Sequence, residues 1–111
     1  MLTFKEFLSE SITRIIKDAV PKFMKDENYK KVREINYWSC ADFAGEVMRR
    51  AKAAGVKGVR MKQSPGMSGH AWIYHNGKHY DAEHPRGVKD SKNLNFFKRE
   101  RKGTNNKWNL R

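Results

Sequence analysis

The chain of 111 residues has only one cysteine, three prolines and half as many acidic as basic side chains. A single cysteine excludes an intramolecular disulfide and a cysteine-rich metal site. Every apolar run is far shorter than the roughly 20 residues that span a membrane, and charged residues interrupt the first ten positions, unlike a signal peptide. We expect one domain over residues 1–111, not secreted, without internal repeats and with a modest hydrophobic core.

The charge is strongly unbalanced. Lys and Arg number 24 against 12 Asp and Glu, a formal net charge of +12, which favours acidic partners or confinement with nucleic acid. Residues 98–111 form a basic tail. The tail is either a solvated, mobile end of the chain or a phosphate contact that does not depend on base sequence, with Trp108 available to stack on a base.

A helix carrying the cysteine is predicted from Ser39 to Gly55. Ser39 and Asp42 have the spacing of an N-terminal capping pair, and Gly55 suits the position after a helix end. Apolar residues recur at helical spacing at Phe43, Ala44, Val47, Met48 and Ala51. Cys40 would then be the first helical residue, where the helix dipole and free N–H groups favour a thiolate.

A β-hairpin is predicted around Asn76-Gly77, the strongest two-residue turn signal. This register pairs Tyr74 with His79 and Ile73 with Tyr80, and it places His70, Trp72, His79, Asp81 and Glu83 on one face. A histidine and a carboxylate are thus within reach of each other, as a base and its orienting group require. The register alone leaves Asp81 and Glu83 as alternative partners of His70.

The remaining elements complete an α+β prediction: an N-terminal helix, a central Cys-bearing helix and a small antiparallel sheet. Capping spacing at Thr3 and Glu6 and an apolar stripe to Phe23 predict the first helix, which Pro21 should end or kink. Residues 56–63 should form a strand, residues 64–69 a connector, and residues 84–87 a turn. Leu94, Phe96 and Phe97 should cover a sheet edge or a cleft rim.

The candidate site combines a lone cysteine with a histidine and an acid, which is a pattern of nucleophilic catalysis. An oxyanion hole needs two donors: the Cys40 N–H is one candidate, and Asn36 or the Trp38 indole is the other. Zinc binding by His70, His79 and Cys40 or a carboxylate is the competing chemistry, although the ligand spacing is not diagnostic. We therefore predict no metal and no cofactor.

These motifs resemble a known family. Cys40 at a helix start followed by Asp42-Phe43-Ala44, then Gly69-His70-Ala71-Trp72 and Tyr80-Asp81, is similar to the transglutaminase-like core of the papain-like cysteine-enzyme fold. The resemblance covers residues 36–90. It implies a catalytic triad of Cys40, His70 and Asp81.

The first ten residues carry a second resemblance. Met1-Leu2-Thr3-Phe4, with Phe7 and a final Leu8-Ser9-Glu10, resembles the capsid-targeting segment of internal head proteins of tailed bacteriophages. The resemblance implies cleavage of residues 1–10, packaging in a phage head and action in the host cytoplasm.

Together these features predict a thiol-dependent acyl hydrolase or acyltransferase acting on an amide or glutamine-type substrate in a host target. Water as acceptor gives hydrolysis and an amine gives transfer, and the residues do not separate the two. The alternative class is a non-catalytic basic protein that binds nucleic acid or inhibits a host protein, and a third interpretation is a degenerate enzyme fold kept as a scaffold.

Overall fold

The computed structural model describes residues 3–64 and 69–103, with side chains described from Glu10 onward and at Thr3. The residues 65–68 of the predicted connector and residues 104–111, with Trp108, lie outside this part. The order of elements is α1 (Phe4–Asp26), α2 (Arg33–Trp38), α3 (Cys40–Ala53), β1 (Arg60–Gln63), β2 (Ala71–His75), β3 (Lys78–Asp81), β4 (His84–Val88), a 3-10 turn (Ser91–Asn93) and α4 (Asn95–Arg101). This α+β arrangement confirms the predicted fold class.

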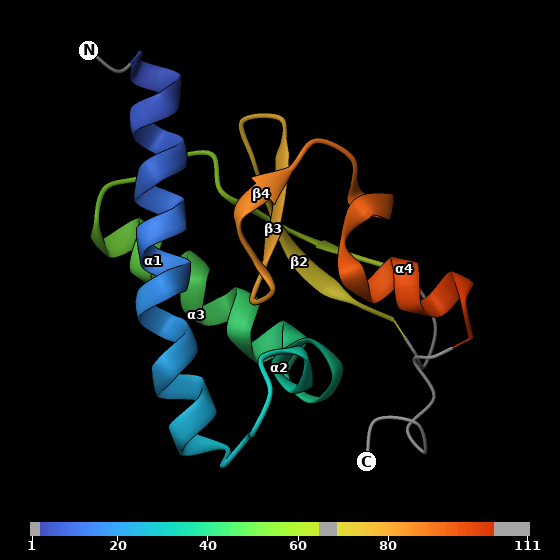
Figure 1. Ribbon diagram of the computed structural model, residues 1–111. Helices are drawn as coiled ribbons and strands as arrows, with labels where there is room; N and C mark the ends of the chain where they lie inside the picture. The colour runs from blue at the N-terminus through green and yellow to red at the C-terminus, as the bar shows by residue number, and fades with distance from the viewer. Residues whose placement is uncertain (1–2, 65–68, 104–111) are drawn as a thin grey trace.

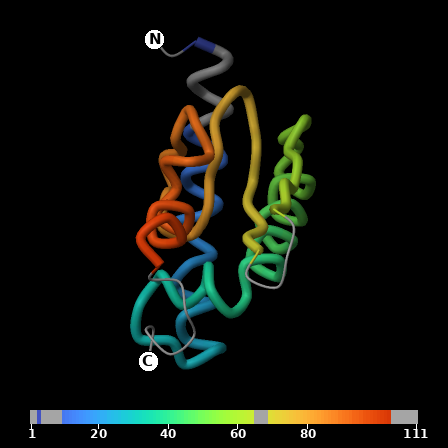
Figure 2. Tube along the Cα trace, turned by 90° about the vertical axis from the view of Figure 1, so that its right-hand side faces the viewer, coloured from blue at the N-terminus to red at the C-terminus, as the bar shows by residue number. Residues whose placement is uncertain are grey.

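The four strands form one antiparallel sheet in the order β1-β2-β3-β4. Helices α1 and α3 pack on one side of the sheet, and α4 lies on the other (Figures 1 and 2). Because side chains alternate along a strand, β2 directs Ile73 into the aliphatic core and Trp72 toward α4. The sheet therefore has two chemically different faces.

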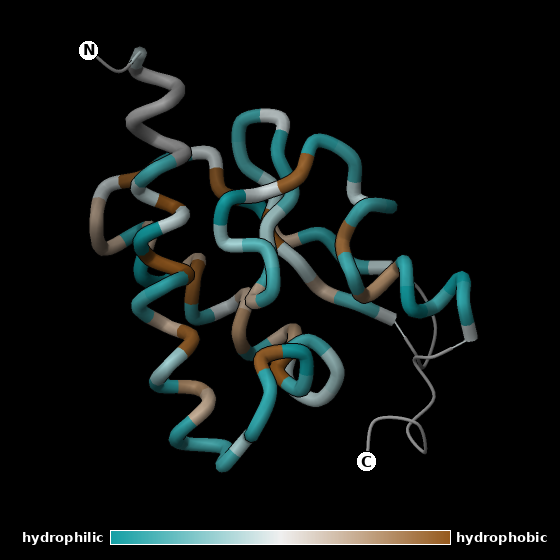
Figure 3. Tube along the Cα trace, viewed as in Figure 1, coloured by the Kyte–Doolittle hydropathy of each residue, from teal (hydrophilic) through white to brown (hydrophobic). Residues whose placement is uncertain are grey.

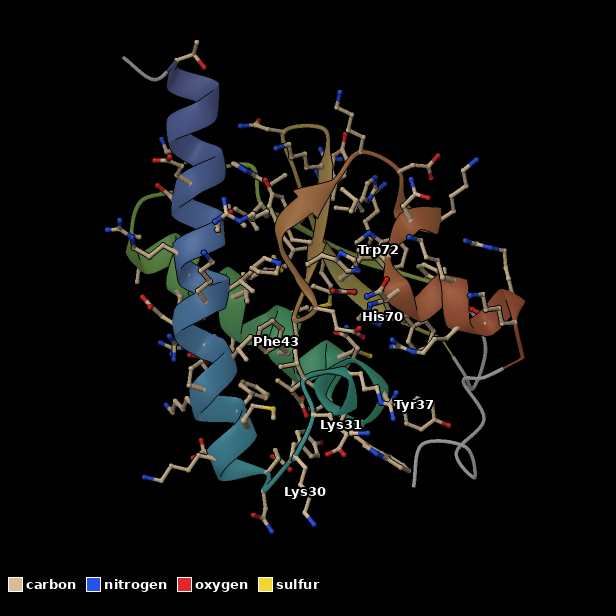
Figure 4. The ribbon with its side chains drawn as sticks, in the orientation of Figure 1. Lys30, Lys31, Tyr37, Phe43, His70 and Trp72 are labelled. Atoms are coloured by element: carbon tan, nitrogen blue, oxygen red, sulfur yellow. The ribbon has the colours of Figure 1, made fainter. Side chains whose placement is uncertain are left out.

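The aliphatic core lies between α1, α3 and the sheet. Apolar segments recur along α1 and α3 (Figure 3), as the helical spacing predicted. Phe43 on α3, which Figure 4 labels, meets Phe23 on α1 edge to face, with 5.2 Å between ring centroids. Other buried members of this cluster are Ile12, Ile16, Ala19, Ile35, Val47, Ile73 and Tyr80.

The hairpin has the predicted register. Asn76 and Gly77 have positive φ angles of 49° and 80°, which a two-residue type I′ turn requires. His75 pairs with Lys78, and the next two pairs follow in step. The Asn76-Gly77 turn signal thus correctly predicted how β2 pairs with β3. These two strands carry residues that flank the site.

The structure differs from the local predictions at Pro21 and at residues 84–87. Of the two outcomes predicted for Pro21, an end or a kink of the helix, the end is wrong. Pro21 does not end α1, which continues to Asp26; Pro21 is exposed, so the carbonyl that loses its helical partner can face water, while Phe23 and Met24 pack against the core. Residues His84–Val88 are strand β4 rather than a turn. Proline is tolerated there because β4 is an edge strand with a register irregularity.

The two ends of the described chain carry segments for which the sequence predicts special roles. The backbone of the predicted cleavage segment, Leu8-Ser9-Glu10, is helical within α1, and its cleavage stays a prediction. The first residues of the predicted basic tail, through Arg101, belong to α4. Within the described residues, no helix is long and apolar enough to cross a membrane.

Candidate active site

Cys40 is the first residue of α3, as predicted, and the turn before it joins two helices. Ser39 ends α2 and also occupies the N-cap position of α3. The predicted side-chain cap is absent, because the Ser39 hydroxyl donates to the Ile35 carbonyl at 3.3 Å and accepts from the Tyr29 hydroxyl at 3.3 Å. The hydroxyl therefore holds α2 and the preceding loop rather than the first turn of α3.

Backbone N–H groups interact with the Cys40 sulfur. The backbone N–H of Ala71 donates to Sγ at 3.4 Å. Burial raises the pKa of the Cys40 thiol, but its interactions with His70 and with the N–H groups of Ala71 and Ala41 outweigh burial and lower the pKa below its ordinary value. This lowered pKa is the condition for a reactive thiolate.

His70 precedes β2 and is held there by the end of β1. Its backbone N–H donates to the Ser64 hydroxyl at 2.8 Å, and its carbonyl accepts from the Ser64 N–H at 2.9 Å. Its ring Nε2 lies 2.9 Å from Oδ2 of Asp81. Both side chains are almost fully buried, so the contact is shielded from solvent.

The turn after β3 orients Asp81. Its second oxygen, Oδ1, accepts from the backbone N–H groups of Glu83 and His84, each at 3.0 Å. The choice that the hairpin register left open is thereby settled in geometry, since Asp81 and not Glu83 bonds to His70. A carboxylate only accepts, so Nε2 carries a proton and Nδ1 is the free acceptor of a neutral ring.

Aromatic side chains hold the imidazole from the α4 side. Phe96 stacks on the His70 ring with 4.4 Å between centroids and an interplanar angle of 13°. Trp72 stacks at 5.9 Å, and Phe97 meets the ring edge on at 5.8 Å. His70 and Trp72 lie side by side next to α4 in Figure 4. Phe96 and Phe97 of the predicted apolar cluster therefore pack against His70 and Trp72. A position of the cluster at a cleft rim stays a prediction.

The remaining ring nitrogen of His70 is Nδ1, since Nε2 contacts Asp81. Nδ1 is buried and has no hydrogen-bond partner among the described residues. Burial lowers the pKa of His70, but the bond to Asp81 and the interaction with Cys40 raise it above its ordinary value. Each of the two side chains therefore favours the charged form of the other, which is a thiolate on Cys40 and an imidazolium on His70.

A pocket of about 190 Å³ opens at the sulfur. Its lining includes Gln63 and Ser64 from the end of β1, together with Cys40 and His70. Gln63 pairs with Ala71 across the sheet, and its side-chain amide donates only a long contact of 3.6 Å to the Met61 sulfur. Sequence reasoning missed Gln63; the pairing of a strand end with the residue after His70 is the signal that would find it.

The two predicted side-chain oxyanion donors are not in this pocket. Asn36 is buried, and its amide donates to Glu83 Oε1 at 3.1 Å. Trp38 is 46 % exposed and packs edge to face on Tyr37. Both residues belong to α2, and these contacts are with Glu83 and Tyr37 rather than with the pocket.

The alternative zinc site is not assembled. His79 accepts a hydrogen bond at Nδ1 from the Trp72 indole at 2.9 Å. In the described part of the chain, no group of three or more His, Cys, Asp or Glu side chains converges as a metal site would require.

The arrangement contains the groups that nucleophilic catalysis requires. A thiol with a lowered pKa lies beside an imidazole whose far nitrogen is fixed by a carboxylate, which is the geometric pattern of nucleophile, base and orienting acid. No protein-family model matches the chain, and neither a curated protein nor a solved structure shows detectable similarity to it.

Proposed function

We propose that the protein is a thiol-dependent acyl hydrolase or acyltransferase with the triad Cys40, His70 and Asp81. The observation that carries the proposal is the buried 2.9 Å contact between His70 and Asp81 beside a thiol at a helix start. The motif resemblance to a transglutaminase-like, papain-like core supports the same interpretation. An amide of the glutamine type is the substrate that this resemblance favours.

The proposed reaction begins with the thiolate. Cys40 Sγ attacks the carbonyl carbon, and the negative charge moves to the carbonyl oxygen. We assign the stabilisation of that charge to the Cys40 backbone N–H and the Gln63 side-chain amide, because both residues line the pocket. Sequence reasoning offered Asn36 or Trp38 for the second role, and Gln63 replaces them because it lines the pocket.

Collapse of the adduct needs a proton for the leaving group. The protonated Nδ1 of His70 gives its proton to the amine nitrogen as the carbon–nitrogen bond breaks, which leaves a thioester on Cys40. Asp81 keeps Nε2 protonated throughout. A water molecule or an acceptor amine then attacks the thioester and gives a proton to neutral His70. Cys40 leaves as a thiolate.

Acylation by an activated ester tests this proposal without a known substrate. With p-nitrophenyl acetate, the wild type should release one equivalent of nitrophenolate rapidly and gain the mass of one acetyl group. Cys40→Ser should show no rapid phase, and Asp81→Asn should acylate more slowly because the imidazole can adopt the wrong tautomer. Wild-type protein that acylates no faster than Cys40→Ser would end the proposal.

The net charge of +12 favours the second candidate, a basic protein that binds nucleic acid or a host protein. Non-specific binding to DNA should weaken steeply between low and physiological salt, because phosphate neutralisation releases counterions. Tight, salt-sensitive binding by Cys40→Ser together with no acylation by the wild type would favour this candidate. Packaging in a phage head would suit either activity.

A further inference from the structure

Glu83 is the hub of a polar network between three separate parts of the chain. Its oxygen Oε1 accepts from Asn36 at 3.1 Å and from Arg99 at 2.6 Å. Oε2 accepts from Asn95 at 3.2 Å and from the second Arg99 nitrogen at 3.0 Å. The Glu83 and Arg99 side chains are only 12 % and 17 % exposed, so these bonds are largely shielded from water.

Each of these partners lies on a helix that is next to a member of the triad. Asn36 is buried on α2, which ends two residues before Cys40. Asn95 and Arg99 belong to α4, the helix whose Phe96 stacks on His70.

The backbone around Glu83 completes the set. The Glu83 N–H donates to Asp81 Oδ1 at 3.0 Å. The neighbouring His84 accepts from the Asn95 N–H at 2.9 Å through its Nε2, which ties the same turn to the start of α4. Glu83 therefore links three elements next to the triad: the helix that precedes Cys40, the helix that packs on His70 and the turn that follows Asp81.

We infer that Glu83 is a positioning residue of the site: its side chain holds α2 and α4 against the turn that follows Asp81. The inference rests on the proposed function. The forked guanidinium of Arg99 and a carboxylate bond in two parallel contacts, which fix direction as well as distance. Removing one partner of such a pair destabilises the fold, because the other charge is left buried and unpaired, and the fixed direction of the two contacts also sets the geometry of the site.

The test measures alkylation of Cys40, the only cysteine of the chain, by iodoacetamide as a function of pH in wild type, Glu83→Gln and Arg99→Lys. Glu46→Gln is the matched control, because it removes another Glu–Arg pair on the outer side of α3. Below its pKa a thiol reacts in proportion to its thiolate fraction. We expect both network variants to react about tenfold more slowly than wild type near pH 6.

The same variants should match wild type near pH 10, where the thiol is fully ionised, and Glu46→Gln should match it throughout. This pattern separates a lost thiolate–imidazolium pair from a general change in access. If folded Glu83→Gln has the same dependence of Cys40 alkylation on pH as the wild type, the inference is overturned. If Glu83→Gln does not fold, the same measurement on Arg99→Lys decides. An ordinary thiol profile in the wild type itself would instead overturn the proposed function.

Discussion

The two faces of the sheet differ in what they require of their side chains. Toward α1 and α3, Ile73 and Tyr80 join a cluster of aliphatic and aromatic residues that exclude water. Toward α4, His70 and Trp72 lie among aromatic rings with defined angles and polar groups with defined partners. One face contributes mainly apolar burial, which depends on area and not on direction, and the other sets the geometry of the candidate site.

Breaking the aliphatic face should give the largest change in stability. Phe43→Ala removes a ring that is 2 % exposed and its contact with Phe23, so the free energy of unfolding should fall by about 3–5 kcal/mol. Urea unfolding measures this loss. Cys40 alkylation, measured where the variant is fully folded, should keep the wild-type pH profile; a shifted profile would show that the two faces are not separable.

A substitution in the pocket should slow acylation without changing the free energy of unfolding. Gln63 is exposed, so Gln63→Ala should unfold like wild type, while loss of an oxyanion donor should slow acylation by p-nitrophenyl acetate by about 10²-fold. The control is Lys62→Ala, the neighbour on β1 whose ammonium lies 5.1 Å from the Tyr74 ring centroid. Equal acylation rates in the two variants would remove Gln63 from the mechanism.

The Glu83 network should make the α4 side sensitive to acid. Burial raises the pKa of Glu83, but Arg99, Asn36 and Asn95 lower it below its ordinary 4.5. Its stabilisation is therefore complete above about pH 4.5 and is lost as the pH falls through the lowered folded value.

Glu83→Gln should accordingly cost about 1.5–3 kcal/mol at pH 7, as expected for hydrogen bonds to a charged group. Urea unfolding of both proteins at neutral and acidic pH gives the comparison. The difference in free energy of unfolding between the two proteins should become smaller in acid, because wild-type Glu83 is then protonated and as uncharged as glutamine. A difference that stays constant with pH would mean that its charge is not what stabilises the network.

The smallest change concerns the aromatic rings around His70. Phe97→Leu keeps an apolar side chain but removes edge-on contacts with His70 and Trp72, which should cost about 0.5–1.5 kcal/mol. Thermal unfolding would measure the difference. If leucine is as stabilising as phenylalanine, the α4 side tolerates substitution like an ordinary apolar face.

Local signals predicted much of this structure. The Asn76-Gly77 turn determined the hairpin register and brought His70 near a carboxylate, and helical spacing with Gly55 located α3. Gly55 has a φ of 77°, and the next N–H bonds back to the Ala51 carbonyl, as a helix-ending motif requires. Each of these features depends on residues close in sequence.

Contacts between distant residues were not predictable in the same way. The Asn36–Glu83 bond joins positions 47 residues apart, and the stacking of Phe96 on His70 depends on where α4 docks. The sequence of β4 predicts a turn because Pro85 and Gly87 are turn residues locally. In the fold, a side chain at Gly87 would collide with the Tyr80 ring, because its first carbon would lie 2.7 Å from the nearest ring carbon. Packing across strands therefore explains the glycine.

The pH dependence of Cys40 alkylation in wild type and His70→Ala tests the central claim most directly. The pKa of Cys40 is lowered by its interaction with His70 against the effect of burial. The wild type should therefore react with iodoacetamide well below the pH at which a free thiol with a pKa of about 8.5 reacts, and His70→Ala should lose that reactivity. Ionisation near the ordinary value in both proteins would contradict the account.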